Sequence, residues 1–187
     1  MDLQYLINNF EKYSFSGYNI LQILQNAGHN VKIIEYNDLG KVNDLDEIFT
    51  DNDAVILSLV RELAPVRIGH WVVLLKKNNL YEYFDPYAYN VIQDLRIAIM
   101  DNPTYLPKLL NNKQQDGYQV NYNSIPLQAL KLNVNTCGAH AICRVLFDKY
   151  TNQQYATMIK NYCAHKTITP DELVILMLSS YLLKLDD

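Results

Sequence analysis

The stretch that decides the fold is Thr136-Cys137-Gly138-Ala139-His140-Ala141-Ile142, which places a thiol at the expected start of an apolar helix. The first turn of a helix stabilises negative charge through its backbone dipoles and N–H groups. Cys137 therefore stands where a cysteine readily becomes a thiolate nucleophile. The alternative is a small buried apolar residue, which is how most free cysteines behave. The stretch alone leaves both interpretations open.

A candidate general base lies upstream in Ile68-Gly69-His70-Trp71-Val72-Val73, a run typical of a strand. A strand holds His70 rigidly, as a general base requires. Trp71 is expected to exclude water from the site or to form one wall of a substrate groove. The alternative is a half-buried strand histidine beside a core tryptophan.

The other three histidines are weaker candidates. His140 follows Cys137 by one helical turn, but a neighbour on the same helix points along the same wall and not across a cleft. His29 and His165 each follow the end of an expected helix, and we expect both to be exposed.

Asp85 is the candidate acid that would orient the imidazole. It ends the expected strand 80–84, which follows the strand 66–75 through the turn Lys76-Lys77-Asn78-Asn79. Antiparallel pairing around that turn brings Asp85 back alongside His70. Asp-Pro is also a common way to begin a turn, and the two roles are compatible.

Acyl transfer needs hydrogen-bond donors for the oxyanion. The backbone N–H of Cys137 is one candidate, and the side chain of Gln128 is a second, with a surface glutamine as its alternative. Gly138 permits close approach of a substrate backbone. The remaining thiols, Cys143 and Cys163, lie inside expected helices and are interpreted as core residues.

The element pattern indicates one α+β domain over residues 1–187, with helices around a mixed or antiparallel sheet and the nucleophile at a helix N-terminus. Helices are expected over 3–10, from a cap at Ser16 to a stop at Gly28, and over 91–100, 138–150, 153–164 and 170–183, the last capped by Thr169. Strands are expected over 31–36, 54–59, 66–75, 80–84 and 118–122. Pro103 and Pro107 are expected to break the chain after the helix at 91–100.

Composition excludes several other classes of protein. Hydrophobic residues make up 49% and charged residues 19% of the 187, which is typical of a globular chain. The net charge of −4 makes nucleic acid an unlikely partner. Three cysteines without a CxxC pair indicate neither a zinc site nor a disulfide framework. With no signal-peptide pattern and no long apolar run, we expect a soluble intracellular protein without a membrane segment.

The ordered set His70-Trp71, Asp85, Gln128 and Cys137-Gly138 resembles the adenain and Ulp1-type cysteine peptidases. Within that clan, Tyr83-Phe84-Asp85-Pro86-Tyr87 and the stretch from Asn135 to Gly138 resemble the maturation proteases of virophages, polinton-like elements and large DNA viruses. The resemblance implies an adenain/Ulp1-like fold and a Cys-His-Asp triad with Gln128 as oxyanion donor. It also implies a narrow cleft that favours small residues such as glycine beside the cut.

Two features depart from the resemblance. The interval between Gln128 and Cys137 is longer than usual in the clan, so Asn133 or Asn135 is an alternative side-chain donor. The adenoviral relative is a basic protein activated by DNA and a viral peptide, whereas this acidic chain supports neither cofactor. We therefore expect no metal or other cofactor, and an activating peptide stays an open question.

The resulting hypothesis is a viral thiol endopeptidase that processes capsid or other structural protein precursors in the host cytoplasm, at the viral factory, and in the virion. The first alternative keeps the fold and removes ubiquitin-like modifiers from host proteins. The second is a non-catalytic assembly or binding domain in which Cys137 and His70 are packing residues. Cleavage tests on capsid-derived and ubiquitin-like substrates, and the reactivity of the thiol, distinguish the three.

Overall fold

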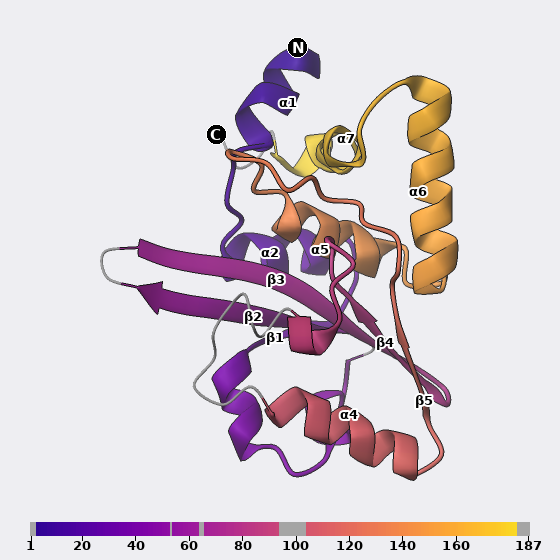
Figure 1. Cartoon of the computed structure of the whole chain (residues 1–187). Coiled ribbons are helices and arrows are strands. Elements are labelled where there is room, and N and C mark those ends of the chain that lie inside the picture. Colours follow the sequence, from indigo (N-terminus) through magenta and orange to yellow (C-terminus); the bar gives the residue numbers. More distant parts are fainter. Residues whose placement is uncertain (1–2, 53, 64–65, 94–103, 183–187) are drawn as a thin grey trace.

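A mixed five-stranded sheet forms the centre of the computed structural model, which describes residues 3–52, 54–63, 66–93 and 104–182 (Figure 1). The strands follow one another across the sheet in chain order: β1 (Val31–Glu35), β2 (Ala54–Leu63), β3 (Val66–Lys77), β4 (Leu80–Phe84) and β5 (Gln119–Tyr122). The two outer pairs are parallel and the two inner pairs antiparallel. Of the two expected sheet types, the mixed sheet is therefore the one that forms.

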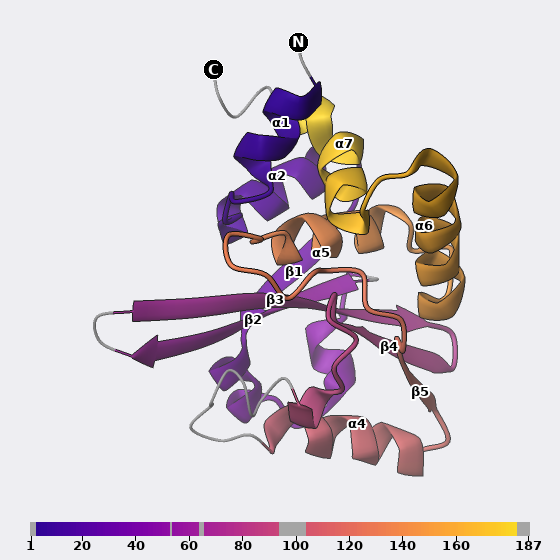
Figure 2. The same cartoon turned by 45° about the horizontal axis from the view of Figure 1, so that its top comes forward.

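Helices cover both faces of this sheet (Figures 1 and 2). One face carries α1 (Leu3–Phe10), α2 (Gly17–Asn26), α5 (Cys137–Leu146), α6 (Asn152–Lys166) and α7 (Pro170–Leu182), and the other carries α4 (Tyr105–Gln115) with the 3-10 helices η1 (Tyr36–Lys41) and η2 (Leu45–Ile48). Along β2, Ile56 joins the apolar cluster on the first face, whereas Val55 and Leu57 join that on the second. The expected α+β architecture is confirmed. Among the described residues, no helix combines the length and apolar character needed to cross a membrane.

Several helix starts follow directly from local sequence. Ser16 caps α2, accepting from the backbone N–H of Asn19 at 3.2 Å. Thr169 caps α7 in the same way: its hydroxyl accepts from the Glu172 N–H, and its own N–H donates to the Glu172 carboxylate at 2.6 Å. Both caps were expected from the sequence, and both are confirmed.

The segment after residue 100 differs from expectation. Pro107 does not break the chain but is the third residue of α4. The N–H groups of a first helical turn have no partner within the helix, so proline is tolerated there. Leu106, Leu109 and Leu110 then bury this helix against the sheet. The helix expected over 91–100 lies mostly outside the described residues.

The register of the sheet determines where the predicted site can form. Val73 of β3 pairs with Phe84, the last residue of β4, and His70 pairs with Leu59 of β2. β2 and β3 therefore continue past the end of β4 (Figure 1). The chain leaves β4 at Asp85, beside the part of β3 that carries His70.

Candidate active site

Three separate elements bring Cys137, His70 and Asp85 together. Cys137 is the first residue of α5, His70 lies in β3, and Asp85 directly follows β4. Nε2 of His70 is 2.6 Å from Oδ1 of Asp85, and the ring is also hydrogen-bonded to the Cys137 thiol.

The surroundings of His70 favour its charged form. Its side chain is 16% exposed and that of Asp85 is fully buried. Burial lowers the pKa of His70, but hydrogen bonds and charge from Asp85 and Cys137 outweigh burial and raise that pKa well above its ordinary value. Tyr87 stacks on the imidazole, with ring centroids 5.1 Å apart. Burial and the negative charges of Cys137 and Asp85 raise the pKa of Tyr87, so its hydroxyl stays protonated.

Asp85 is held from several directions. The backbone N–H of Tyr89 donates to Oδ2 at 2.8 Å, which leaves Oδ1 for the imidazole. The N–H of Ala88 donates to the Asp85 carbonyl at 2.8 Å and closes the expected turn. Asn123 binds both backbone groups of Asp85, accepting at 2.9 Å and donating at 2.7 Å. Asp85 thus starts a turn and orients the histidine.

Gln128 is buried, not a surface residue. Its backbone N–H donates to the Pro86 carbonyl at 3.0 Å, which places it next to the Asp85 turn. Its side-chain Nε2 lies 3.4 Å from the carbonyl of Val134, in the loop that leads to Cys137. Its Oε1 is buried, and within the described parts of the chain it has no hydrogen-bond partner.

The two alternative donors have other surroundings. Asn135 donates its side-chain amide to the Lys12 carbonyl at 2.9 Å. Asn133 is exposed and has a left-handed backbone, with φ of 68°. Of the three candidate donors, Gln128 alone is buried, and its side chain contacts the loop that precedes Cys137.

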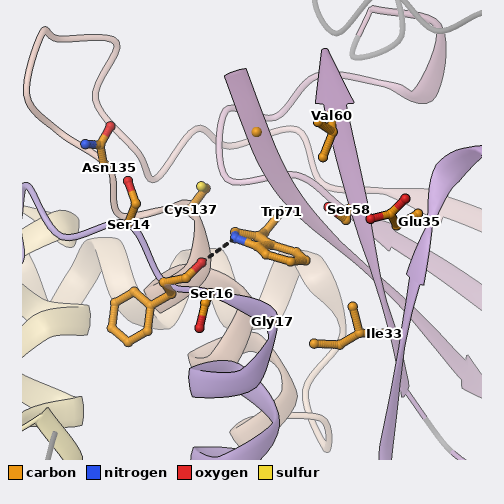
Figure 3. Close-up of a pocket in the computed structure, with 12 residues that line it drawn as sticks. Ser14, Ser16, Gly17, Ile33, Glu35, Ser58, Val60, Trp71, Asn135 and Cys137 are labelled. Atoms are coloured by element: carbon orange, nitrogen blue, oxygen red, sulfur yellow. Dashed lines mark hydrogen bonds between the residues drawn. The ribbon is translucent and has the colours of Figure 1, made fainter. Parts of the chain in front are cut away.

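A groove of about 540 Å³ runs from Cys137 over Trp71 toward β1 (Figure 3). Glu35, Ser58 and Trp71 form one row across the sheet at its floor. The segment Ser14–Gly17 forms the facing wall, and Trp71 Nε1 donates to the Phe15 carbonyl at 3.0 Å. Trp71 thus joins the floor of the groove to its wall.

Gly69 and Gly138 have different roles in the site. A Cβ on Gly69 would meet no atom within 4 Å, so this floor position is open to the groove. A Cβ on Gly138 would lie 2.6 Å from Cβ of Phe15. Gly138 is buried, and its missing side chain makes room for Phe15 behind the nucleophile.

His140 is paired with a carboxylate other than Asp85. Its Nε2 lies 3.1 Å from Oδ1 of Asp171, and the side chain is completely buried. Asp171 also accepts from the Thr136 hydroxyl and, at 2.9 Å, from the Ala129 N–H. His140, the weaker candidate base, is therefore bound to Asp171.

The remaining candidates have ordinary positions. His165 is exposed as expected, whereas His29 is half-buried, with Nδ1 3.8 Å from the carboxylate of Asp148. Cys143 and Cys163 are buried, as expected of core residues, and burial raises the pKa of both thiols.

Four residues around the site escaped the sequence argument. Tyr87 stood in a quoted motif, but the sequence argument assigned it no role in the site. Asp171 was hidden in the start signal of α7, where an acidic residue is ordinary. Asn123 and Phe15 act through contacts between segments far apart in the chain, and no local pattern indicates them.

This arrangement is suited to thiol chemistry. The thiol at a helix start is suited to the role of nucleophile, and the imidazole beside it can accept its proton as a base. The buried carboxylate is suited to orienting that imidazole. The described ranges contain no cluster of three or more histidine, cysteine, aspartate or glutamate side chains fit to hold a metal ion.

Comparison with known proteins gives relatives in sequence and in structure. No family model matches the chain. It is 25% identical over 173 residues to uncharacterized protein V9 of Sputnik virophage, covering 90% of this chain and 95% of the relative. It is similar to the C-terminal Ulp1 protease domain solved in complex with Smt3, the yeast ortholog of SUMO, with 12% identity and a TM-score of 0.41 over 94% of this chain and 81% of the other. It is also similar to a Ulp1 structure with the catalytic cysteine oxidized to a sulfenic acid, with 11% identity and a TM-score of 0.40 over 96% of this chain and 93% of the other.

Proposed function

We propose that the protein is a cysteine endopeptidase whose catalytic residues are Cys137, His70 and Asp85. The observation that carries the proposal is the continuous line from the buried Asp85 carboxylate through the imidazole to the thiol. These groups come from separate elements, and the thiol opens onto a groove. A packing role for the same residues would not require an open groove at the sulfur.

In the mechanism, His70 holds the proton of Cys137, and Asp85 stabilises the imidazolium. The thiolate attacks the carbonyl carbon of the scissile peptide, so that a C–S bond forms and the carbonyl oxygen becomes an oxyanion. The Cys137 N–H and the Gln128 side chain stabilise that oxyanion. The scissile C–N bond breaks as His70 gives its proton to the leaving amine, which leaves an acyl-enzyme. His70 then takes a proton from water, whose oxygen attacks the acyl carbon. The C–S bond breaks, the acid leaves and the thiolate is restored.

The groove supports an extended peptide substrate with small residues beside the cut. Trp71 and the Ser14–Gly17 wall are tied by a hydrogen bond, which limits the width next to Cys137. At Gly69 the floor carries no side chain, and a substrate backbone can approach the sheet there. Gly138 supports the site from behind through its close packing on Phe15.

We further propose that the substrates are precursors of viral capsid or other structural proteins, processed in the host cytoplasm at the viral factory and in the virion. This proposal is supported by the sequence similarity between this chain and a virophage protein, which extends over 90% of this chain. The chemistry requires no metal or other cofactor, and the net charge of −4 does not favour nucleic acid as a partner.

The test is incubation of the purified protein, in parallel, with the structural proteins of the same genome and with a ubiquitin-like C-terminal fusion, followed by mass spectrometry of new termini. Cys137→Ala is the matched control, because it removes the sulfur and leaves the helix start intact. New termini that require Cys137 support the proposal. Cleavage confined to a ubiquitin-like C-terminal fusion would overturn the capsid assignment, and equal activity of Cys137→Ala would overturn the peptidase itself.

A further inference from the structure

Asp171 is a buried carboxylate that the proposed mechanism does not use. It is 2% exposed and accepts three hydrogen bonds, from the Ala129 N–H, the Thr136 hydroxyl and Nε2 of His140. A buried carboxylate is costly unless several donors satisfy it. Here the donors come from one loop and one helix and converge on the first turn of α7.

Two of these donors lie at opposite ends of one loop. Ala129 directly follows Gln128, and Thr136 directly precedes Cys137. Asp171 therefore holds both ends of the loop 129–136, which joins the candidate oxyanion donor to the nucleophile. At the end next to Thr136, the Asn135 N–H also donates to the carbonyl of Glu11, the residue that follows α1, at 2.8 Å.

The middle of the same loop is held by short internal hydrogen bonds, from the Lys131 N–H to the Ala129 carbonyl at 3.0 Å and from the Val134 N–H to the Lys131 carbonyl at 3.3 Å, and by little apolar burial. Leu132 is 95% exposed and Leu130 is 72% exposed, and Asn133 has a left-handed backbone. Exposed apolar side chains contribute no burial that would order the segment. The contacts that fix the loop to the rest of the molecule lie mainly at its two ends, where Asp171 binds.

We propose that Asp171 is a positioning residue: through Ala129 and Thr136 it sets the distance between the Gln128 side chain and the start of α5, and so assembles the oxyanion-binding site. His140 is the brace that fixes the carboxylate, and it is not an alternative base. The inference rests on the proposed peptidase function. It adds the residue that orders the loop 129–136 between Gln128 and Cys137, which we call the donor loop.

The first test compares two probes of Cys137. Iodoacetamide alkylates the thiolate by displacing iodide and needs no oxyanion donor. The second probe is an acetylated tetrapeptide aldehyde ending in Gly-Gly. The thiolate adds to its carbonyl carbon, and the oxyanion that forms requires the Cys137 N–H and the Gln128 side chain as hydrogen-bond donors until it takes up a proton. A variant that disturbs only the donor loop should lose affinity for the aldehyde and keep its alkylation rate.

The matched variants are Thr136→Val and Thr136→Ser. Thr136→Val removes the hydroxyl that donates to Asp171 at nearly constant side-chain volume, and Thr136→Ser keeps that hydroxyl. We expect Thr136→Val and Asp171→Asn to bind the aldehyde about 10-fold to 100-fold more weakly, in line with a misplaced oxyanion donor, with alkylation within about threefold of wild type. Thr136→Ser should stay within about threefold in both assays. Thr151→Ala, which removes the cap of α6, controls for a general loss of stability.

The second test does not depend on activity. Hydrogen exchange at the Ala129 amide, followed by NMR, should accelerate at least tenfold in Asp171→Asn and stay unchanged in Thr151→Ala. Unchanged exchange in Asp171→Asn would overturn the inference, as would an aldehyde affinity and an alkylation rate that fall together in Thr136→Val. If wild-type Cys137 reacts with neither probe, the peptidase proposal fails while the exchange result still decides the role of Asp171.

Discussion

The two histidine–aspartate pairs of this molecule contain the same groups in different surroundings. His70 and Asp85 are 2.6 Å apart, with 16% of the histidine side chain exposed, whereas His140 and Asp171 are 3.1 Å apart and the histidine is fully buried. The first pair meets a thiol at the end of a groove, and the second meets a hydroxyl and a backbone N–H. Exposure and the third partner, more than the pair itself, distinguish the histidine that we propose as the base from the one that we propose as a structural support.

The largest difference is expected in catalysis. His70→Ala should lower kcat/KM for peptide hydrolysis by about 10³-fold or more, because the thiol loses its proton acceptor. His140→Gln, whose amide can donate to Asp171 in place of Nε2, should lose less than about tenfold. Steady-state hydrolysis of the cleavage peptide measures both, and equal losses would remove the functional distinction between the two histidines.

Asp85→Asn should follow, with kcat lowered by about 10²-fold to 10⁴-fold. The amide neither stabilises an imidazolium nor holds the required tautomer. Single-turnover acylation measures the effect directly. Asp148→Asn is the control, since it removes the carboxylate beside His29 and should change the rate by less than about twofold.

Stability should rank the histidines in the opposite order. His140→Ala leaves a cavity and an unsatisfied buried carboxylate, and we expect it to lower the free energy of unfolding by about 2–4 kcal/mol. His70→Ala also removes the partner of a buried carboxylate, Asp85. The Tyr89 N–H still donates to that carboxylate, and His70 is 16% exposed, so water can take the place of the imidazole. We therefore expect a smaller cost, about 1–2 kcal/mol. Urea unfolding of both variants in the Cys137→Ala background measures the difference, and a larger cost at His70 would contradict the brace role of His140.

The two pairs should also respond to pH in opposite directions. The pKa of His70 is raised on folding, so its contribution is full below its unfolded pKa near 6.5 and is lost as pH rises through the raised folded value. Burial raises the pKa of Asp171, but hydrogen bonds and charge from His140, Thr136 and Ala129 outweigh burial and lower it. Its contribution is therefore present above an unfolded pKa near 3.9 and is lost as pH falls through the lower folded value.

Unfolding free energies of wild type, His70→Ala and Asp171→Asn, measured from pH 3 to pH 10, test these signs. The gap between wild type and His70→Ala should narrow toward alkaline pH. The gap between wild type and Asp171→Asn should narrow toward acid pH. Parallel curves for the two variants would show that the pairs do not differ electrostatically.

The smallest effect is expected at Tyr87. Its ring stacks on His70 at 5.1 Å, and Tyr87→Phe keeps that ring. We expect Tyr87→Phe to change kcat/KM by less than about twofold and Tyr87→Ala to lower it about threefold to tenfold, because the imidazole then loses one side of its packing. A large loss in Tyr87→Phe would indicate a role for the hydroxyl.

The first pair could be predicted from sequence because it depends on a local hairpin. Asn78 has the left-handed backbone expected of the turn, with φ of 45°, and the pairing of Val73 with Phe84 follows from it. The position of Asp85 beside His70 is then a matter of strand geometry.

The second pair could not be predicted because it joins two helices that are far apart in the chain. No periodicity in α5 or α7 indicates that His140 meets Asp171. The burial of Gln128 likewise depends on a bond to Pro86 from a distant turn. Pro107 was misread for a different reason, since its tolerance depends on where the helix begins.

The rate at which iodoacetamide alkylates Cys137 at pH 6, in wild type and in His70→Ala, tests the central claim most directly. Mass spectrometry locates the label, and the buried Cys143 and Cys163 serve as internal references. If His70 keeps a thiolate at the start of α5, wild type should react at least tenfold faster than His70→Ala at this pH. Equal rates in the two proteins would contradict the account.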